Sequence, residues 1–120
     1  MRLFVLLLFV FSIGLVSQAQ VTIKLADVSN HIGDSVKVCG KVGGIRYMET
    51  AKDQPTLINM GAAYPNQLLT VVIFSEARKE FEKAPEELFN YKDICITGKI
   101  ELYKDKPQIV VKHTAQIQIQ

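Results

Sequence analysis

The feature that most constrains the fold is a stretch of alternating side chains, Ser35–Tyr47, with two adjacent glycines inside it. Between Val36 and Val42, valines recur at every second or fourth position among lysine, cysteine and glycine, which is the period of a strand with one buried face. Gly43 and Gly44 then interrupt the alternation, as happens where a long strand bends or forms a bulge. The stretch predicts the long, sharply bent first strand of a small closed β-barrel.

A second copy of this pattern lies near the other end of the chain. The run Ile94–Ile100 repeats the run Val36–Val42 with its glycine and lysine in register. Gly98 predicts a kink in this second strand, since a closed barrel needs curvature there too. The repeat predicts that the two bent strands are neighbours in one fold.

The two cysteines, Cys39 and Cys95, lie in the two copies, out of phase with the residues that face the core. If these strands are neighbours in an oxidising compartment, the two sulfurs can form a disulfide. The alternative is two independent thiols on the barrel wall, because Cα atoms more than about 7 Å apart cannot be bridged. The sequence leaves both open.

The order of the other elements predicts the fold class. A helical turn is expected at 25–28, and the tail 116–120 alternates without an obvious partner. The expected strands are 35–47, 56–60, 69–74, 93–102 and 107–111, with a helix over 76–91 that Pro85 divides. This is the order of an OB-fold, an all-β, five-stranded Greek-key barrel with one helix between strands three and four. An open antiparallel sheet with a helix across it is the alternative, but it leaves two apolar edges exposed.

The first residues predict export. Met1 and Arg2 precede an apolar run, Leu3–Val16, and Ser17–Ala19 supplies the small residues that a signal peptidase requires. A membrane anchor is the alternative, but the run is shorter than the roughly 18 residues that span a bilayer. We therefore expect a cleaved signal peptide at 1–19 and a single secreted or periplasmic domain at 20–120. Gln20 offers no thiol for a lipid, so no stable membrane insertion is expected after cleavage.

The basic and acidic side chains are nearly balanced in number, so the chain is not a strongly basic protein. The chain has 14 basic and 12 acidic side chains and a formal charge of +2, which falls to +1 when the signal peptide removes Arg2. Such a balance gives weak long-range attraction to a polyanion. Any affinity for nucleic acid must come from a local basic patch.

Three stretches carry a family resemblance: VKVCGKV, LINMGAAYPNQLLTVVIF and DICITGKIELYKDKPQIVV. Between Val36 and Lys112 they make the chain similar to small secreted bacterial OB-fold proteins related to the anticodon-binding, nucleic-acid-binding OB group. The resemblance implies a fold more than a ligand, because one fold hosts many functions. Periplasmic OB-fold proteins without a nucleic-acid role share the signal peptide and the topology.

OB-fold proteins bind ligands across strands two and three and between the loops that join strands one to two and four to five. Here those loops are expected at Glu49–Gln54 and Tyr103–Lys106. The candidate nucleic-acid contacts near this face are the basic residues Lys41, Arg46, Lys52, Lys99, Lys104 and Lys106, with Tyr47, Tyr64 and Tyr103 as stacking platforms. The alternative is that the lysines are solvated strand-edge charges and that at least one tyrosine belongs to the core.

Acidic residues lie among these candidates: Glu49, Asp53, Glu101 and Asp105. They would repel a phosphate backbone, and the same mixture of charges suits a protein partner equally well.

Signatures of catalysis are absent from the sequence. His31 and His113 are the only histidines, and neither lies in a nucleophile or metal motif. No GxSxG, HExxH or phosphate-binding glycine loop is present. We therefore expect no enzymatic activity, no metal site and no cofactor. The expected function is weak binding of single-stranded nucleic acid, and the alternative is an extracytoplasmic module that binds a protein partner or a small ligand.

Overall fold

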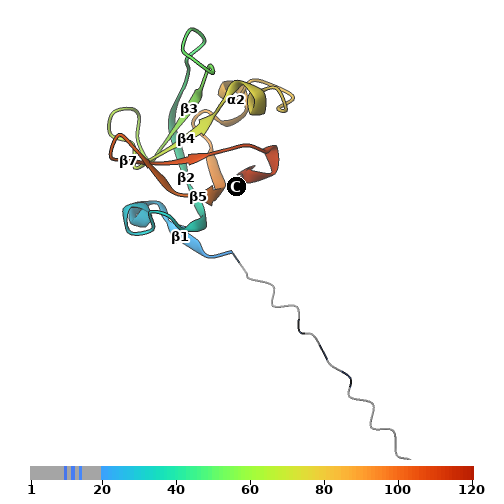
Figure 1. Ribbon diagram of the computed structural model, residues 1–120. Coiled ribbons are helices and arrows are strands. Elements are labelled where there is room, and N and C mark those ends of the chain that lie inside the picture. The colour runs from blue at the N-terminus through green and yellow to red at the C-terminus, as the bar shows by residue number, and fades with distance from the viewer. Residues whose placement is uncertain (1–9, 11, 13, 15–19) are drawn as a thin grey trace, which may run out of the picture.

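The structure is a computed structural model that describes residues 10, 12, 14 and 20–120 (Figure 1). The expected signal peptide, 1–19, falls almost wholly outside these described residues. Within them, no helix is both long enough and apolar enough to cross a membrane. From Gln20 onward the chain folds around one hydrophobic core.

Strands make up most of the regular structure, and the helices are short. The strands are β1 (Thr22–Lys24), β2 (Ser35–Tyr47), β3 (Thr56–Met60), β4 (Leu69–Ile73), β5 (Asp93–Lys99), β6 (Glu101–Tyr103), β7 (Lys106–Val110) and β8 (Ile117–Ile119). The helices are the α-helices α1 (Ser75–Arg78) and α2 (Pro85–Phe89) and the 3-10 helices η1 (Leu25–Asn30) and η2 (Thr114–Gln116). The expected strands 35–47 and 56–60 and the helical turn at 25–28 are confirmed.

Strand β2 organises the sheet. Its first half pairs antiparallel with β5 and its second half pairs antiparallel with β3. The full order is β6-β7-β4-β3-β2-β5-β8, with β1 alongside β2. Because β1 runs parallel to β2 and β4 runs parallel to β7, the sheet is mixed. The all-β expectation is confirmed, and the neighbouring positions of the two repeated strands are confirmed as well.

The described strands number eight in one sheet, where the sequence predicted five. The expected strand 93–102 is divided at Ile100, which is fully buried between β5 and β6. The short strand β1 was not predicted from the sequence. The tail also has a partner, since β8 pairs antiparallel with β5 and places Ile117 opposite Ile96. The pairing was missed because it depends on contacts distant in sequence.

The side chain of Gln116 holds the connection between β7 and β8 in place by hydrogen bonds. Its amide nitrogen donates to the carbonyl oxygen of Thr97 at 3.0 Å. Its carbonyl oxygen accepts from the backbone N–H groups of Lys112 and His113 at 2.8 and 3.0 Å. Gln116 therefore satisfies backbone groups of the β7–β8 connection and of β5.

The double glycine is the site of an irregularity in β2, as the sequence predicted. Val42 pairs with Met60 but Gly44 pairs with Asn59, so Gly43 is an extra residue on the β2 side. A Cβ atom at Gly43 would lie 2.3 Å from the backbone carbon of Ala62. The connection between β3 and β4 therefore folds directly against the bulge, which requires glycine there.

The core is filled by alternate residues of several strands. Fully buried side chains come from β2 (Val38, Val42), β3 (Ile58, Met60), β4 (Leu69, Ile73), β5 (Ile94, Ile96) and β7 (Ile109). Each pair is separated by two or four positions along its strand, so one face of the sheet points inward throughout.

The predicted helix over 76–91 is wrong in its extent. Only α1 and α2 are helical, and residues 79–84 between them form turns and bends. Pro85 occupies the first turn of α2, and the residue before it is extended (φ −56°, ψ 135°), as proline requires. Tyr91, the last residue of the expected helix, is 68% exposed and has a φ of 60°. The apolar residues of this segment that are buried are Ala77, Pro85 and Phe89.

Candidate functional site

Strand register decides which of the predicted contact residues lie together. Because β4 and β7 are parallel, with Thr70 opposite Gln108, the connection 61–68 and the β6–β7 turn reach the same end of the sheet. Figure 1 shows these two loops extending to one side beside the β7 label, while the β2–β3 loop extends elsewhere. We call the end of the sheet with the connection 61–68 and the β6–β7 turn the β6–β7 end. The end with the β2–β3 loop is the β2–β3 end.

The β6–β7 end collects more than half of the predicted contacts: Lys41, Tyr64, Tyr103, Lys104 and Lys106. Tyr64 is 70% exposed and Tyr103 is 59% exposed. The backbone N–H of Gly61 donates to the carbonyl of Lys41 at 2.8 Å, which holds β2 against the start of the loop that carries Tyr64. The Nζ atom of Lys104 lies 5.4 Å from the ring centroid of Tyr103. Tyr103, Lys104 and Lys106 therefore lie together on one hairpin, and the loop that carries Tyr64 reaches the same end of the sheet.

The remaining predicted contacts lie elsewhere. Arg46 and Tyr47 pair with the start of β3, and Lys52 belongs to the loop beyond them, so all three are at the β2–β3 end. Lys99 pairs with Ser35 in the part of the sheet that joins β2 to β5. The structure does not bring these four residues to the β6–β7 end.

Two leucines at the β6–β7 end were not singled out by the sequence. Leu68 is 46% exposed and Leu102 is 54% exposed, and they lie next to β4 and within β6. Glu101 and Asp105 are exposed at this end as well. Leu102 alternates with its neighbours like a core residue, so periodicity alone could not reveal its exposure.

Tyr47 faces α1 instead of the lysines. The guanidinium carbon of Arg78 lies 3.6 Å from the centroid of the Tyr47 ring, so one face of this ring is already covered. Arg78 also donates to the hydroxyl oxygen of Thr56 at 2.8 Å and to both carboxylate oxygens of Glu86. Arg78 thus joins α1 to α2, β2 and β3.

The ion pair between Arg78 and Glu86 makes stability depend on pH. Hydrogen bonding from Arg78 lowers the pKa of Glu86 below its ordinary value of 4.5. The stabilisation is therefore fully present above pH 4.5 and is lost as the pH falls through the lowered pKa of the folded protein. We expect Glu86→Gln to lower the free energy of unfolding more at about pH 7 than at about pH 3, measured by urea denaturation. Glu87→Gln is the matched control, since Glu87 is exposed on the same helix, and an equal pH dependence in both variants would contradict the assignment.

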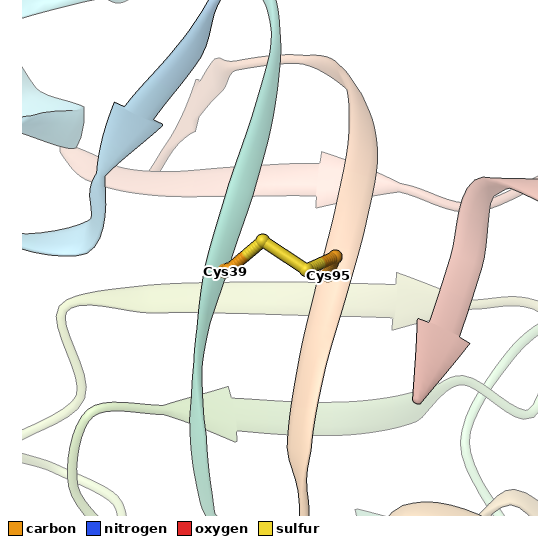
Figure 2. Close-up of a disulfide and its surroundings, with 2 residues drawn as sticks. All are labelled: Cys39 and Cys95. Atoms are coloured by element: carbon orange, nitrogen blue, oxygen red, sulfur yellow. A yellow bond between two sulfur atoms is a disulfide. The ribbon is translucent and has the colours of Figure 1, made fainter. Parts of the chain in front are cut away.

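The two cysteines form a disulfide, which decides between the alternatives that the sequence left open. Cys39 and Cys95 are direct register partners on β2 and β5, and their Cα atoms are 4.0 Å apart. Figure 2 shows the bridge spanning these two neighbouring strands. Cys95 is only 8% exposed. The bridge locks the two repeated strands together at the middle of their shared ladder.

Two hollows in the described surface lie away from the β6–β7 end. One, of about 310 Å³, is lined by Tyr47 and by residues of α1 and the α1–α2 connection. Another, of about 440 Å³, lies beside His31 and Ser35. Among the described residues, no three His, Cys, Asp or Glu side chains are placed to hold a metal ion. Neither of these two hollows includes a residue of the β6–β7 end.

Comparisons with known proteins identify a fold and no family. No family model matches this chain, and no curated protein matches it either. An aspartyl-tRNA synthetase from Leishmania major is similar in structure, with a TM-score of 0.52 and 10% identity over 88% of this chain and 22% of that chain. An OBody bound to hen egg-white lysozyme is similar with a TM-score of 0.52 and 17% identity, over 84% of this chain and 92% of that chain. The chain thus spans about a fifth of the synthetase chain, and both similarities are consistent with an OB-related fold.

Proposed function

We propose that this protein is a non-enzymatic module that binds single-stranded nucleic acid weakly through its β6–β7 end. The observation that supports this most is the exposure of Tyr64 and Tyr103 at the same end of the sheet as Lys41, Lys104 and Lys106. Two tyrosines of this kind offer bases a stacking surface without sequence preference, and the lysines offer contacts to phosphate. The site is smaller than the sequence predicted, because four of the candidate residues lie elsewhere.

The expected dissociation constant can be estimated from these tyrosines and lysines. Stacking of one base on an aromatic side chain contributes about 1 to 3 kcal/mol. Two stacked bases with a few phosphate contacts give micromolar to submillimolar dissociation constants, in the range typical of non-specific binding. Glu101 and Asp105 keep the electrostatic part small, so affinity is expected to depend only moderately on salt.

We propose further that the sheet closes as the five-stranded barrel of an OB-fold. Support comes from Ile100, the single residue between β5, which pairs with β2, and β6, which pairs with β7. If β5 and β6 act as one bent strand, both ends of the path β7-β4-β3-β2 meet on it. In that arrangement the β6–β7 end is one rim of the barrel. The resemblance to the nucleic-acid-binding OB group is consistent with this geometry.

An exported location fits the same proposal. The disulfide between Cys39 and Cys95 is of the kind that persists in oxidising compartments such as the periplasm or the extracellular space. We propose cleavage after Ala19 and a mature domain that begins at Gln20. N-terminal sequencing of protein recovered from the periplasm or the culture medium checks this assignment.

The proposed binding predicts a large loss of affinity in one variant. We expect Tyr64→Ala/Tyr103→Ala to weaken binding of a fluorescent oligonucleotide by at least about tenfold, because two stacking surfaces are removed. Fluorescence anisotropy at low salt measures this. Tyr91→Ala is the matched control, since Tyr91 is 68% exposed but lies on the α2–β5 connection. Absence of wild-type binding at about 100 μM protein, or equal losses in both variants, would overturn the proposal.

A protein partner at the same end is the second candidate, and it is favoured by Leu68 and Leu102. Exposed leucines contribute to protein interfaces and add nothing to phosphate recognition. The OBody that resembles this chain binds a protein, lysozyme, according to its description. Under this alternative, a partner captured from envelope extract survives nuclease treatment and is lost with Leu68→Ser/Leu102→Ser. Oligonucleotide binding would then be absent.

A further inference from the structure

The hollow beside α1 has features of a ligand pocket that the proposed function does not use. Its volume is about 310 Å³, and it lies between the loop end of the β2–β3 hairpin and the connection 79–84. Sites for small molecules are usually about 300 to 1,000 Å³, so this one is at the small end of the range. We call it the α1 pocket.

Two aromatic rings form walls of the α1 pocket. Tyr47 is held by Arg78, which covers one face of its ring at 3.6 Å. Phe81 is fixed by Phe89, with ring centroids 5.8 Å apart and planes at 86°. Both rings are partly exposed, so their orientation is set by packing while part of each surface remains accessible. Such walls favour a flat, aromatic group in the ligand.

The charged residues around the α1 pocket favour an anion. Lys79, Lys83, Arg78 and Glu82 all line it. Arg78 is already neutralised by Glu86, through two hydrogen bonds at 2.5 and 3.0 Å. Lys79 and Lys83 make no ion pair among the described residues, and both are exposed. Lys79 and Lys83 therefore offer two ammonium groups at the mouth, beside the carboxylate of Glu82.

We propose that the α1 pocket binds a small aromatic anion of the nucleoside monophosphate class. The base would contact Tyr47 and Phe81, and the phosphate would contact Lys79 and Lys83. Lysine is well suited to phosphate as a point charge. The α1 pocket is separate from the β6–β7 end, because Tyr47 is at the β2–β3 end of the same strands. The two sites can therefore be tested independently.

Calorimetric titration of the mature domain with AMP tests the proposal. We expect a dissociation constant of about 1 mM or below, and much weaker binding of adenosine and of inorganic phosphate, because each lacks one half of the recognised chemistry. Lys79→Gln/Lys83→Gln should weaken AMP binding by at least about tenfold. Both lysines are exposed, so the double variant should keep its fold, which near-ultraviolet circular dichroism checks.

Lys104→Gln/Lys106→Gln is the matched control, because it removes the same charge from the β6–β7 end. This control should bind AMP like the wild type while losing affinity for an oligonucleotide. The proposal is overturned if AMP does not bind, if adenosine or phosphate binds as tightly as AMP, or if the two double variants lose AMP affinity equally. If the Lys79/Lys83 variant loses oligonucleotide binding and the Lys104/Lys106 variant keeps it, the assignment of the oligonucleotide site to the β6–β7 end is contradicted. The proposal for AMP in the α1 pocket is not affected by that result.

Discussion

Replacing Cys39 and Cys95 together by serine should lower the free energy of unfolding by about 4 kcal/mol. The bridge closes a loop of 56 residues, more than half of the described fold, and its main effect is to restrict the unfolded chain. Serine fits both positions, because the two residues are direct partners in an antiparallel ladder and Cys39 is partly exposed. Urea denaturation of the oxidised wild type and the double variant measures the difference.

Reductant provides the control for this prediction. Adding it should lower the midpoint of wild-type unfolding to nearly that of the double serine variant and should leave that variant unchanged. A loss below about 1 kcal/mol would mean that the unfolded chain is already compact around this loop, contrary to the entropic argument. The unfolding transition should remain cooperative in both proteins, since the core does not include the cysteine side chain of β2.

The sequence predicted the centre of the fold well because the signal there is local and repeated. The alternation between Val36 and Val42, and its copy between Ile94 and Ile100, identified two neighbouring strands. The copies also placed one cysteine on each of these strands, but whether Cys39 and Cys95 are paired stayed open until the register was known. Gly43 and Gly44 marked the bulge, since a break in alternation at glycine has few other causes.

Prediction failed where a structure depends on contacts that are distant in sequence. The partner of β8 is β5, and nothing in an alternating tail specifies which edge it joins. The helical spacing over 76–91 is real, but residues 79–84 turn before Pro85 and Tyr91 points into solvent. Arg78 looked like one more surface charge, and only the folded chain brings it to Glu86, Thr56 and Tyr47.

The candidate site was only partly predictable because residues on one strand alternate between two faces. Arg46 and Tyr47 are adjacent, so one of them points away from the other, and Tyr47 turns toward α1. Tyr64 and Tyr103 lie far apart in the chain, yet the parallel pairing of β4 with β7 brings their loops to one end. That pairing joins residues 38 positions apart in the chain, and no local pattern in either strand predicts it.

Gly43→Ala should lower the free energy of unfolding by about 3 kcal/mol, at the upper part of the range for overpacking. The added Cβ would lie 2.3 Å from the carbon of Ala62 and 2.6 Å from both its oxygen and the nitrogen of Ala63. All three atoms belong to backbone, so no side-chain rotation relieves the contact and the connection 61–68 must move. Since this loop carries Tyr64, oligonucleotide affinity should fall in the same variant.

Gly44→Ala is the matched control for this prediction. It lies one position along the same strand, and nothing comes within 4 Å of the Cβ it would add. We expect its free energy of unfolding to stay within about 0.5 kcal/mol of the wild type, since it replaces glycine in an extended strand without a new contact. Urea denaturation of the wild type, Gly43→Ala and Gly44→Ala measures these differences in the free energy of unfolding. Equal stability of both alanine variants would show that the connection 61–68 is free to move away from the bulge, and the β6–β7 end would then lack the rigidity that its tyrosines and lysines require.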